Sequence, residues 1–350
     1  MLAVIASMRR AIAPLVSRLK PYLRWVILGG TLFFLLHTLR LHWQEVAAIR
    51  IDGSGWALLA IALLITLLAH VWAGWVWGWI LEELGYDALG AWSISAYLKT
   101  NVAKYLPGNV WHFYGRVMAA KSVGVPLEGA AVSVVMEPLL MAIAALIVAF
   151  ASNQRINIAL QLIGLCLGLT LIHPRVMNPI LQKLAAAKRK LTPTSSPSPS
   201  SPSPSTPPTS SPSPSSPSPS TPPLSPPLSP PPTPAILKKY PLLPLLGELI
   251  FLALRGAGFI GAVMALHSIT WSDVLPLLSA FSIAWMLGLV VPGAPGGIGV
   301  FEATALALLD GSIPSGLLLG AVAFYRLVST LAEAIGAGLA WGFGKLTKQG

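Results

Sequence analysis

The residues of this sequence best suited to chemistry are charged side chains that interrupt or adjoin its apolar stretches. They are Lys99, Lys104, Arg116, Glu137, Glu248, Arg255, Glu302, Arg326 and Glu333. A charge at the centre of a membrane costs roughly 3 kcal/mol on insertion scales, so such residues usually face a polar interior and mark a substrate path. Arginine and lysine bind phosphate, whereas carboxylates bind cationic groups. The chemistry indicated is recognition of a polar-headed lipid.

Several of these charges leave two interpretations open. Arg116 either pairs with a phosphate or with an acid such as Glu137, or it snorkels to the cytoplasmic interface. Glu137 lies in mid-span and needs a partner, for which both Arg116 and Arg255 are candidates. Arg326 and Glu333 are seven residues apart, two helical turns, so we expect them to share one inward face of the last span.

A glycine pair offers a second way to bind an anion. Gly296 and Gly297 precede an apolar stretch, and a helix that starts there exposes backbone N–H groups and a partial positive charge. Glu302 lies in the second turn of that expected helix. It either stabilises the helix dipole and binds a cation, or forms a structural salt bridge to Arg255 or Arg326.

The elements that carry these residues are membrane spans. Hydrophobic residues make up 54% of the chain and charged residues 10%, whereas soluble domains carry about 25% charged residues. Apolar runs reach or approach the roughly 20 residues that cross a bilayer core. They are Tyr22–Leu39, Trp56–Leu81, Gly129–Ala151, Ile156–Ile172 and Leu242–Leu266. With the last span they predict an all-α polytopic membrane protein with six full spans.

A low-complexity tract divides the chain into two halves. Thr192–Pro234 consists almost entirely of Ser, Pro and Thr, which cannot bury enough surface to fold. It separates an N-terminal membrane half, Met1–Leu191, from a C-terminal membrane half, Ala235–Gly350. We expect an inert linker, with docking of a partner on its proline motifs as the alternative.

Two further apolar stretches are broken by proline and glycine. Ala91–Val123 contains Pro107-Gly108, and Asp273–Asp310 contains the run that begins at Pro292. Proline and glycine interrupt helices, so each stretch predicts a re-entrant hairpin, with kinked full spans as the alternative. Lys104 lies beside the first break. A span, a hairpin and a span occur once in each half with opposite orientation, which is typical of an inverted-repeat transporter with a midplane site.

The positive charges orient the spans. The net charge is +11, and the lysines and arginines lie between spans. Positive charge in these positions sets the orientation of the spans and attracts anionic headgroups, and it does not indicate nucleic-acid binding. Both termini and the linker carry excess positive charge and are expected in the cytoplasm. We expect a plasma membrane protein of the bacterial inner-membrane type.

Other chemistries lack the residues that they require. The single cysteine, Cys166, excludes an internal disulfide, and the six histidines have no metal-ligand spacing. The glycine-rich segments lack the Lys-Ser/Thr of a phosphate loop. We therefore expect no metal, no cofactor and no enzymatic activity. Gly74 and Gly78 form a small-residue face that predicts close helix packing.

Two motifs carry a resemblance to a known family. Lys104-Tyr-Leu-Pro-Gly-Asn109-Val-Trp-His-Phe-Tyr-Gly-Arg116 and Pro295-Gly-Gly-Ile-Gly-Val-Phe-Glu302-Ala resemble the signatures of a flippase-like family. That family includes the membrane domain of lysylphosphatidylglycerol synthases. The resemblance implies an integral-membrane architecture and movement of a polar-headed lipid between leaflets. The sequence departs from the full-length synthases because it has no large soluble aminoacyl-transfer domain after its spans, so synthase activity is not expected.

The resulting hypothesis is a lipid translocase whose two halves rock around a polar cavity. The rival hypothesis is a membrane scaffold that regulates an envelope-lipid enzyme without transporting. The expected partners are membrane lipids, with a second copy of the chain or such an enzyme as protein partners. The residues expected to bind substrate are Lys104, Asn109, Arg116, Glu137, Arg255, Gly296, Gly297, Glu302, Arg326 and Glu333.

Overall fold

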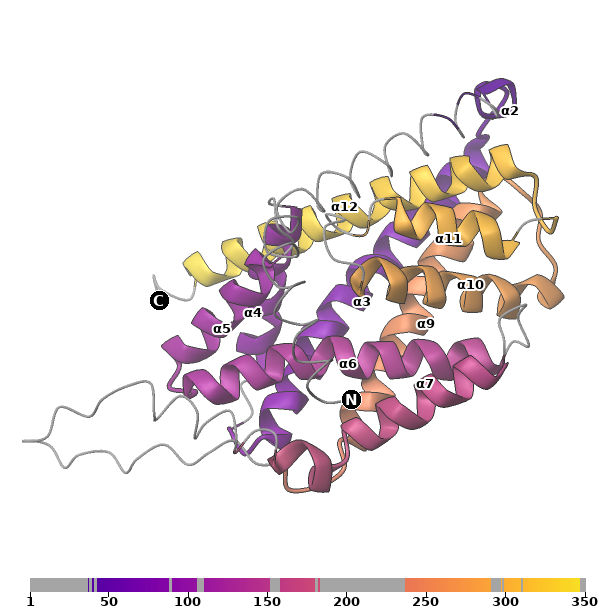
Figure 1. Cartoon of the computed structure of the whole chain (residues 1–350). Helices are drawn as coiled ribbons and strands as arrows, with labels where there is room; N and C mark the ends of the chain where they lie inside the picture. Colours follow the sequence, from indigo (N-terminus) through magenta and orange to yellow (C-terminus); the bar gives the residue numbers. More distant parts are fainter. Residues whose placement is uncertain are drawn as a thin grey trace, which may run out of the picture.

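The computed structural model describes residues 37, 40, 43–87, 90–105, 110–151, 158–179, 182, 237–290, 297, 299–309 and 311–346. Regular structure within these residues is helical (Figure 1). The principal helices are α2 (Trp43–Ala47), α3 (Gly53–Glu83), α4 (Gly90–Asn101), η1 (Val102–Tyr105), α5 (Trp111–Ser122), α6 (Leu127–Ala151), α7 (Ile158–Leu171), α9 (Leu242–Met264), α10 (Trp271–Val290), α11 (Val300–Leu309) and α12 (Ser315–Leu346). The predicted linker and most of the predicted first span lie outside the described residues.

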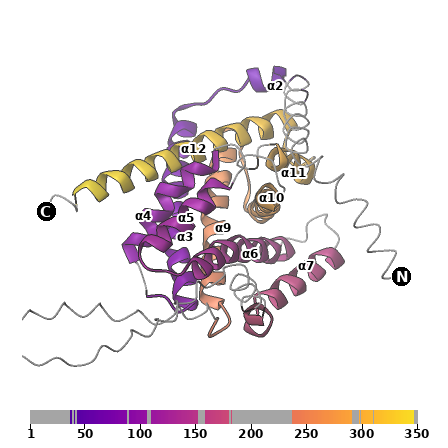
Figure 2. The ribbon, with the colours of Figure 1, turned by 60° about the vertical axis from the view of Figure 1, so that its left-hand side comes forward.

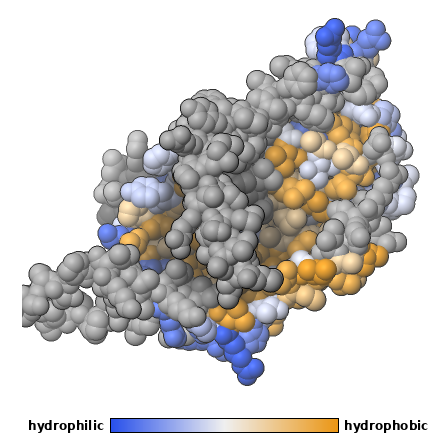
Figure 3. Space-filling view, in the orientation of Figure 1, coloured by the Kyte–Doolittle hydropathy of each residue, from blue (hydrophilic) through white to orange (hydrophobic). Residues whose placement is uncertain are grey.

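Five of the described helices are long and apolar enough to cross a membrane: α3, α6, α9, α10 and α12. Where the face in Figure 3 is coloured, hydrophobic residues predominate and hydrophilic residues gather toward its edges. A surface of this kind needs lipid to cover it. The chain is therefore an all-helical membrane protein.

Two helices bear on the predicted number of spans. Helix α7 contains 14 residues of the predicted full span Ile156–Ile172, and it begins directly after residues 152–157, which lie outside the described residues. Helix α10 has the length of a span, although the sequence favours it as one arm of a hairpin. Residues 106–109 and 291–296, which contain the two predicted breaks, lie outside the described residues.

Helix α3 begins at a clear N-terminal signal. The Asp52 carboxylate accepts hydrogen bonds from the Gly55 amide at 2.7 Å and from the Ser54 hydroxyl. These bonds lower the pKa of Asp52, the Gly55 amide contributing most. The N-cap therefore fixes where the longest helix of the N-terminal half starts.

Glycines allow α3 to pack closely on its neighbours. A Cβ at Gly74 would lie 2.7 Å from the Ile94 Cα of α4, and one at Gly258 of α9 would lie 2.4 Å from the Thr66 hydroxyl oxygen of α3. Gly78 likewise faces Ser93 of α4. The predicted small-residue packing face of α3 is confirmed, and its partner is α4.

The helix contacts follow a regular scheme around a central pair. Helices α3 and α9 pack against each other (Figure 1). Helix α3 also contacts α4 and α12, and α9 contacts α10 and α6. Helix α12 packs on α4, and α6 packs on α10. Helices α10 and α11 lie side by side, as do α6 and α7 (Figures 1 and 2).

A pair of glycines brings the chain before α11 back against α10. Gly297 has φ +71°, a conformation that glycine adopts without strain. A Cβ on Gly297 would lie 2.9 Å from the Cα of Gly288 in α10. The backbone at position 297 is therefore held against α10 with no room for a side chain.

Candidate functional site

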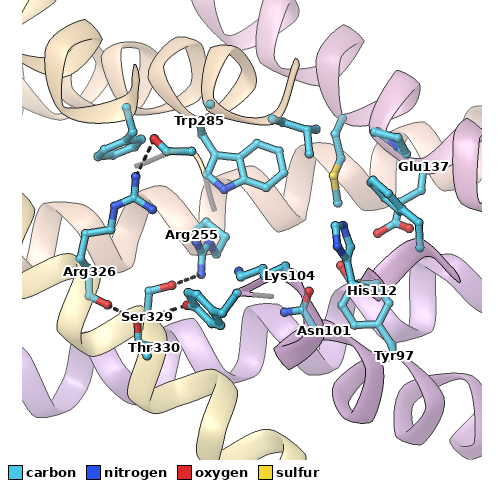
Figure 4. Close-up of a pocket in the computed structure, with 18 of the residues that line it drawn as sticks. Tyr97, Asn101, Lys104, His112, Glu137, Arg255, Trp285, Arg326, Ser329 and Thr330 are labelled. Atoms are coloured by element: carbon cyan, nitrogen blue, oxygen red, sulfur yellow. Dashed lines mark hydrogen bonds between the residues drawn. The ribbon is translucent and has the colours of Figure 1, made fainter. Parts of the chain in front are cut away.

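A cavity of about 360 Å³ lies between the two halves of the chain. Its walls come from α4, η1, α5 and α6 on one side and from α9, α10, α11 and α12 on the other (Figure 4). The predicted site residues that line it are Lys104, Arg116, Glu137, Arg255, Gly297, Glu302 and Arg326. Glu333 pairs with Lys104 beside this wall. Asn109 and Gly296 lie outside the described residues.

An ion pair between α11 and α12 forms one end of the cavity. Arg326 Nε donates to Glu302 Oε1 at 2.8 Å, and Arg326 Nη2 donates to the Gly297 carbonyl at 3.1 Å. The other oxygen of Glu302 accepts from the Gly299 amide. Of the alternatives for Glu302, the structural salt bridge is observed, and its partner is Arg326, not Arg255.

The predicted anion site at Gly296 and Gly297 lies partly outside the described residues. Helix α11 begins at Val300, and the Glu302 carboxylate binds the buried amide of Gly299. A carboxylate of the protein therefore takes the position that an anion would need at this amide.

A second ion pair, between α5 and α6, forms the opposite end (Figure 4). Arg116 Nη1 donates to Glu137 Oε2, and both side chains are buried. The Arg116 guanidinium lies 4.3 Å from the centre of the Tyr97 ring and 5.6 Å from that of Phe113. The snorkelling alternative for Arg116 is wrong, because the guanidinium is directed into the protein. Arg255 is not the partner of Glu137.

A third ion pair joins the two halves of the chain. Lys104 Nζ of η1 lies 2.5 Å from Glu333 Oε1 of α12. His70 Nε2 of α3 lies 3.2 Å from the same carboxylate oxygen. The expected inward face of the last span is confirmed, since Arg326 and Glu333 both reach these buried polar clusters.

Arg255 differs from the other three cations that line the cavity. Its Nη1 lies 2.9 Å from the Ser329 hydroxyl and 3.1 Å from His70 Nε2, while its Nε has no hydrogen-bond partner. The residue is only 4% exposed. Among the residues that the structure describes, no carboxylate lies within ion-pair distance of it. Arg255 lies in the middle of the cavity, between the two terminal ion pairs (Figure 4).

Aromatic and apolar side chains complete the lining. The rings of Phe301 and Tyr325 stack at an interplanar angle of 26°, and the Arg255 guanidinium lies 5.4 Å from the Tyr325 ring centre. Trp285 of α10 and Phe113 of α5 also face the cavity. The site therefore combines one unpaired cation with apolar walls, a combination typical of a ligand pocket.

Several buried polar groups at the site were not among the predicted site residues, His70 and Ser329 among them. His70 was not predicted because the six histidines follow no motif spacing. It is the single titratable residue between Asp52 and Glu82, and that isolation was the available signal. The Ser329 hydroxyl, which contacts Arg255, carries no comparable signal because serine is common on packed membrane helices.

Comparison with known protein families and with curated proteins gives no match. The two motifs that carry the family resemblance contribute to opposite walls of the cavity. Lys104 and Arg116 lie on one wall, and Gly297 and Glu302 lie on the other. The described parts of both motifs therefore meet at one site.

Proposed function

We propose that this chain is a lipid translocase that binds an anionic, phosphate-bearing headgroup at Arg255. The observation that carries the proposal is a buried guanidinium that lines a cavity without an ion-pair partner among the described residues. A buried charge is normally paired, so an unpaired one is a place where an anionic ligand would be stabilised. A guanidinium also matches the geometry of phosphate oxygens.

The dimensions of the cavity support a lipid headgroup as the ligand. Its volume of about 360 Å³ lies at the small end of ligand pockets, which span roughly 300–1,000 Å³. Such a space fits a headgroup better than a whole diacyl lipid, whose chains would remain in the bilayer. The aromatic side chains Trp285, Phe113 and Phe301 would contact the apolar part next to the phosphate.

We further propose an inverted repeat that exchanges α3, α4, α5 and α6 with α9, α10, α11 and α12. In this exchange α3 corresponds to α9, α4 to α10, α5 to α11 and α6 to α12. The observed contact of α3 with α12 then corresponds to that of α9 with α6, and the contact of α12 with α4 corresponds to that of α6 with α10. It also relates the two terminal ion pairs with their charges reversed: Arg116 and Glu137 in one half, Glu302 and Arg326 in the other. Two related halves around one site are typical of alternating-access transporters.

The membrane topology that goes with this proposal has six full spans and two re-entrant hairpins. Tyr22–Leu39 and the stretch that contains α7 would each supply one span beside α3, α6, α9 and α12, and the α4–α5 and α10–α11 pairs would be the hairpins. Both termini would be cytoplasmic, in a plasma membrane, because basic residues flank the spans on that side. The motif resemblance to the flippase-like family agrees with this architecture and with lipid movement.

The experiment that tests the proposed function is lipid transport by the purified protein in liposomes. A fluorescent anionic phospholipid and a fluorescent polyprenyl phosphate would be compared with a lipid whose headgroup lacks phosphate. We expect protein-dependent movement of a phosphate-bearing lipid between leaflets. If folded protein moves none of them, the translocase proposal fails and the membrane-scaffold hypothesis takes its place.

A further inference from the structure

A buried carboxyl group without a partner lies just outside the cavity. Glu248 of α9 is 0% exposed, and neither of its carboxyl oxygens has a hydrogen-bond partner among the described residues. It plays no part in the three ion pairs of the site. An ionised carboxylate in an apolar interior without a partner is so costly that the group takes up a proton instead.

Helix α9 packs on α6, which in turn packs on α5. The charged groups that act electrostatically on Glu248 are Glu137 of α6 and Arg116 of α5. The Arg116 guanidinium is already paired with Glu137 and lies against the Tyr97 ring. One guanidinium therefore stands against two buried carboxyl groups, and two carboxylates in such a position cannot both stay ionised.

Within the part of the chain that the structure describes, the other elements packed against α9 contribute no counter-charge to this cluster. On α3, His70 contacts Glu333 and lies within hydrogen-bond distance of Arg255. On α12, Arg326 and Glu333 belong to the other ion pairs. On α10, the described charged residue is Asp273, in the first turn of the helix. On α9 itself, Arg255 lies seven residues beyond Glu248 and is the proposed phosphate ligand.

We propose that Glu248 is a proton-binding site and carries a proton through the transport cycle. In the conformation seen here Glu248 is protonated, and Glu137 holds the single negative charge opposite Arg116. When the halves rearrange and water reaches the site, the Glu248 carboxylic acid gives its proton to water, leaving a carboxylate and a hydronium ion. Protonation from the opposite side returns the starting state. This inference rests on the proposed translocase function.

Coupling would follow from the electrostatics of the cavity. Glu137 lines the cavity and interacts electrostatically with Glu248, so a bound phosphate adds negative charge near the two carboxyl groups. That negative charge favours the protonated form of Glu248, and the proton in turn favours the bound anion. The lipid phosphate and the proton would therefore bind together, and a pH gradient would drive the lipid across the membrane.

Two measurements on the full chain test this site. Infrared difference spectroscopy in detergent should show a protonated carboxyl band at neutral pH that disappears in Glu248→Gln. In liposomes, the steady-state distribution of a fluorescent anionic phospholipid should shift about tenfold per pH unit of gradient for each coupled proton. Glu248→Gln should remove this shift, because the amide cannot exchange a proton. Glu82→Gln, at an exposed acid near the end of α3, should behave as wild type.

The outcomes separate the proton site from the translocase itself. Lipid movement by the wild type that ignores the pH gradient would overturn the proton site and leave the translocase standing. Absence of the carboxyl band would also overturn the proton site. No lipid movement by folded wild type would overturn the translocase and the coupling together. If Glu248→Gln fails to fold, Glu248→Asp should retain both the band and the response to the gradient, and loss of either in that variant would contradict the proposal.

Discussion

At the scale of single residues, the site is distinguished by which charges are paired. Lys104, Arg116 and Arg326 each bind a carboxylate. Two of the pairs join consecutive helices, and the pair of Lys104 with Glu333 connects the two halves of the chain. Their first effect is to hold the cavity walls in place. Arg255 has no such pair among the described residues, and it is the cation that we propose binds a ligand.

Glu302 provides a test of the structural ion pairs. Glu302→Gln should lower the free energy of unfolding by about 1.5–3 kcal/mol, the range for hydrogen bonds to charged groups. The variant weakens the contact to Arg326 and the cap at Gly299. Thermal unfolding in detergent would measure the loss, and membrane insertion should persist. Lipid transport should also fall, as it should in Arg326→Ala. Unchanged stability and transport would show that this end of the cavity has no structural role.

The charged residues of the site could be predicted from the sequence, but their ion-pair partners could not. The intramembrane charges were recognisable because each interrupts or adjoins an apolar run. Glu137 had two candidate partners, Arg116 and Arg255, and only the packing of α5 on α6 decides between them. The same holds for Glu302, whose partner depends on where α12 passes α11. His70 was missed because its partners lie 185 and 263 residues away in the chain.

At the scale of elements, close packing depends on glycine at the crossing of α3 and α4. Gly74→Ala places a methyl group 2.7 Å from the Ile94 Cα and 3.1 Å from the Tyr97 Cβ. Overpacking of this kind typically costs about 1–3 kcal/mol. We expect lower thermal stability and weaker lipid transport, because Tyr97 stands over Arg116 at the cavity wall.

Gly338→Ala is the matched control for this substitution. Gly338 lies in the exposed part of α12, with no atom within 4 Å of an added Cβ. Alanine in a helix interior is about 0.5–1 kcal/mol more favourable than glycine, so this variant should gain stability. Equal losses in both variants would mean that α3 and α4 do not meet as described.

The presence of a helix could be predicted from the sequence more closely than the residues at which it begins and ends. The apolar run Trp56–Leu81 became α3 with only a few residues added at each end, because an uninterrupted apolar segment with an Asp52 cap has few alternatives. The run Ile156–Ile172 contains α7, which is described from Ile158 to Leu171. Composition could not distinguish α10 as a hairpin arm from α10 as a span, since both are equally apolar.

At the scale of the whole molecule, the two halves form one site although a long Ser/Pro tract separates them in the sequence. Helices α3 and α9, one from each half, pack together at the centre, and Lys104 and Glu333 connect the halves at the cavity. This arrangement does not require the tract to carry structure.

Deletion of residues 194–232 is the corresponding prediction. The shortened chain should insert, fold and transport lipid at close to the wild-type rate, because the described halves associate through their helices. Transport in liposomes and thermal stability in detergent would be compared with wild type. A deleted protein that folds normally but has lost transport would show that the tract takes part in function.

The central claim is that Arg255 holds the anionic headgroup, and one measurement tests it most directly. Transport of a fluorescent anionic phospholipid in liposomes would be compared for wild type, Arg255→Gln and Gly338→Ala. The account predicts that Arg255→Gln folds and inserts but loses at least 90% of transport, corresponding to about 1.4 kcal/mol or more, while Gly338→Ala transports normally. Normal transport of this lipid by Arg255→Gln would contradict the account.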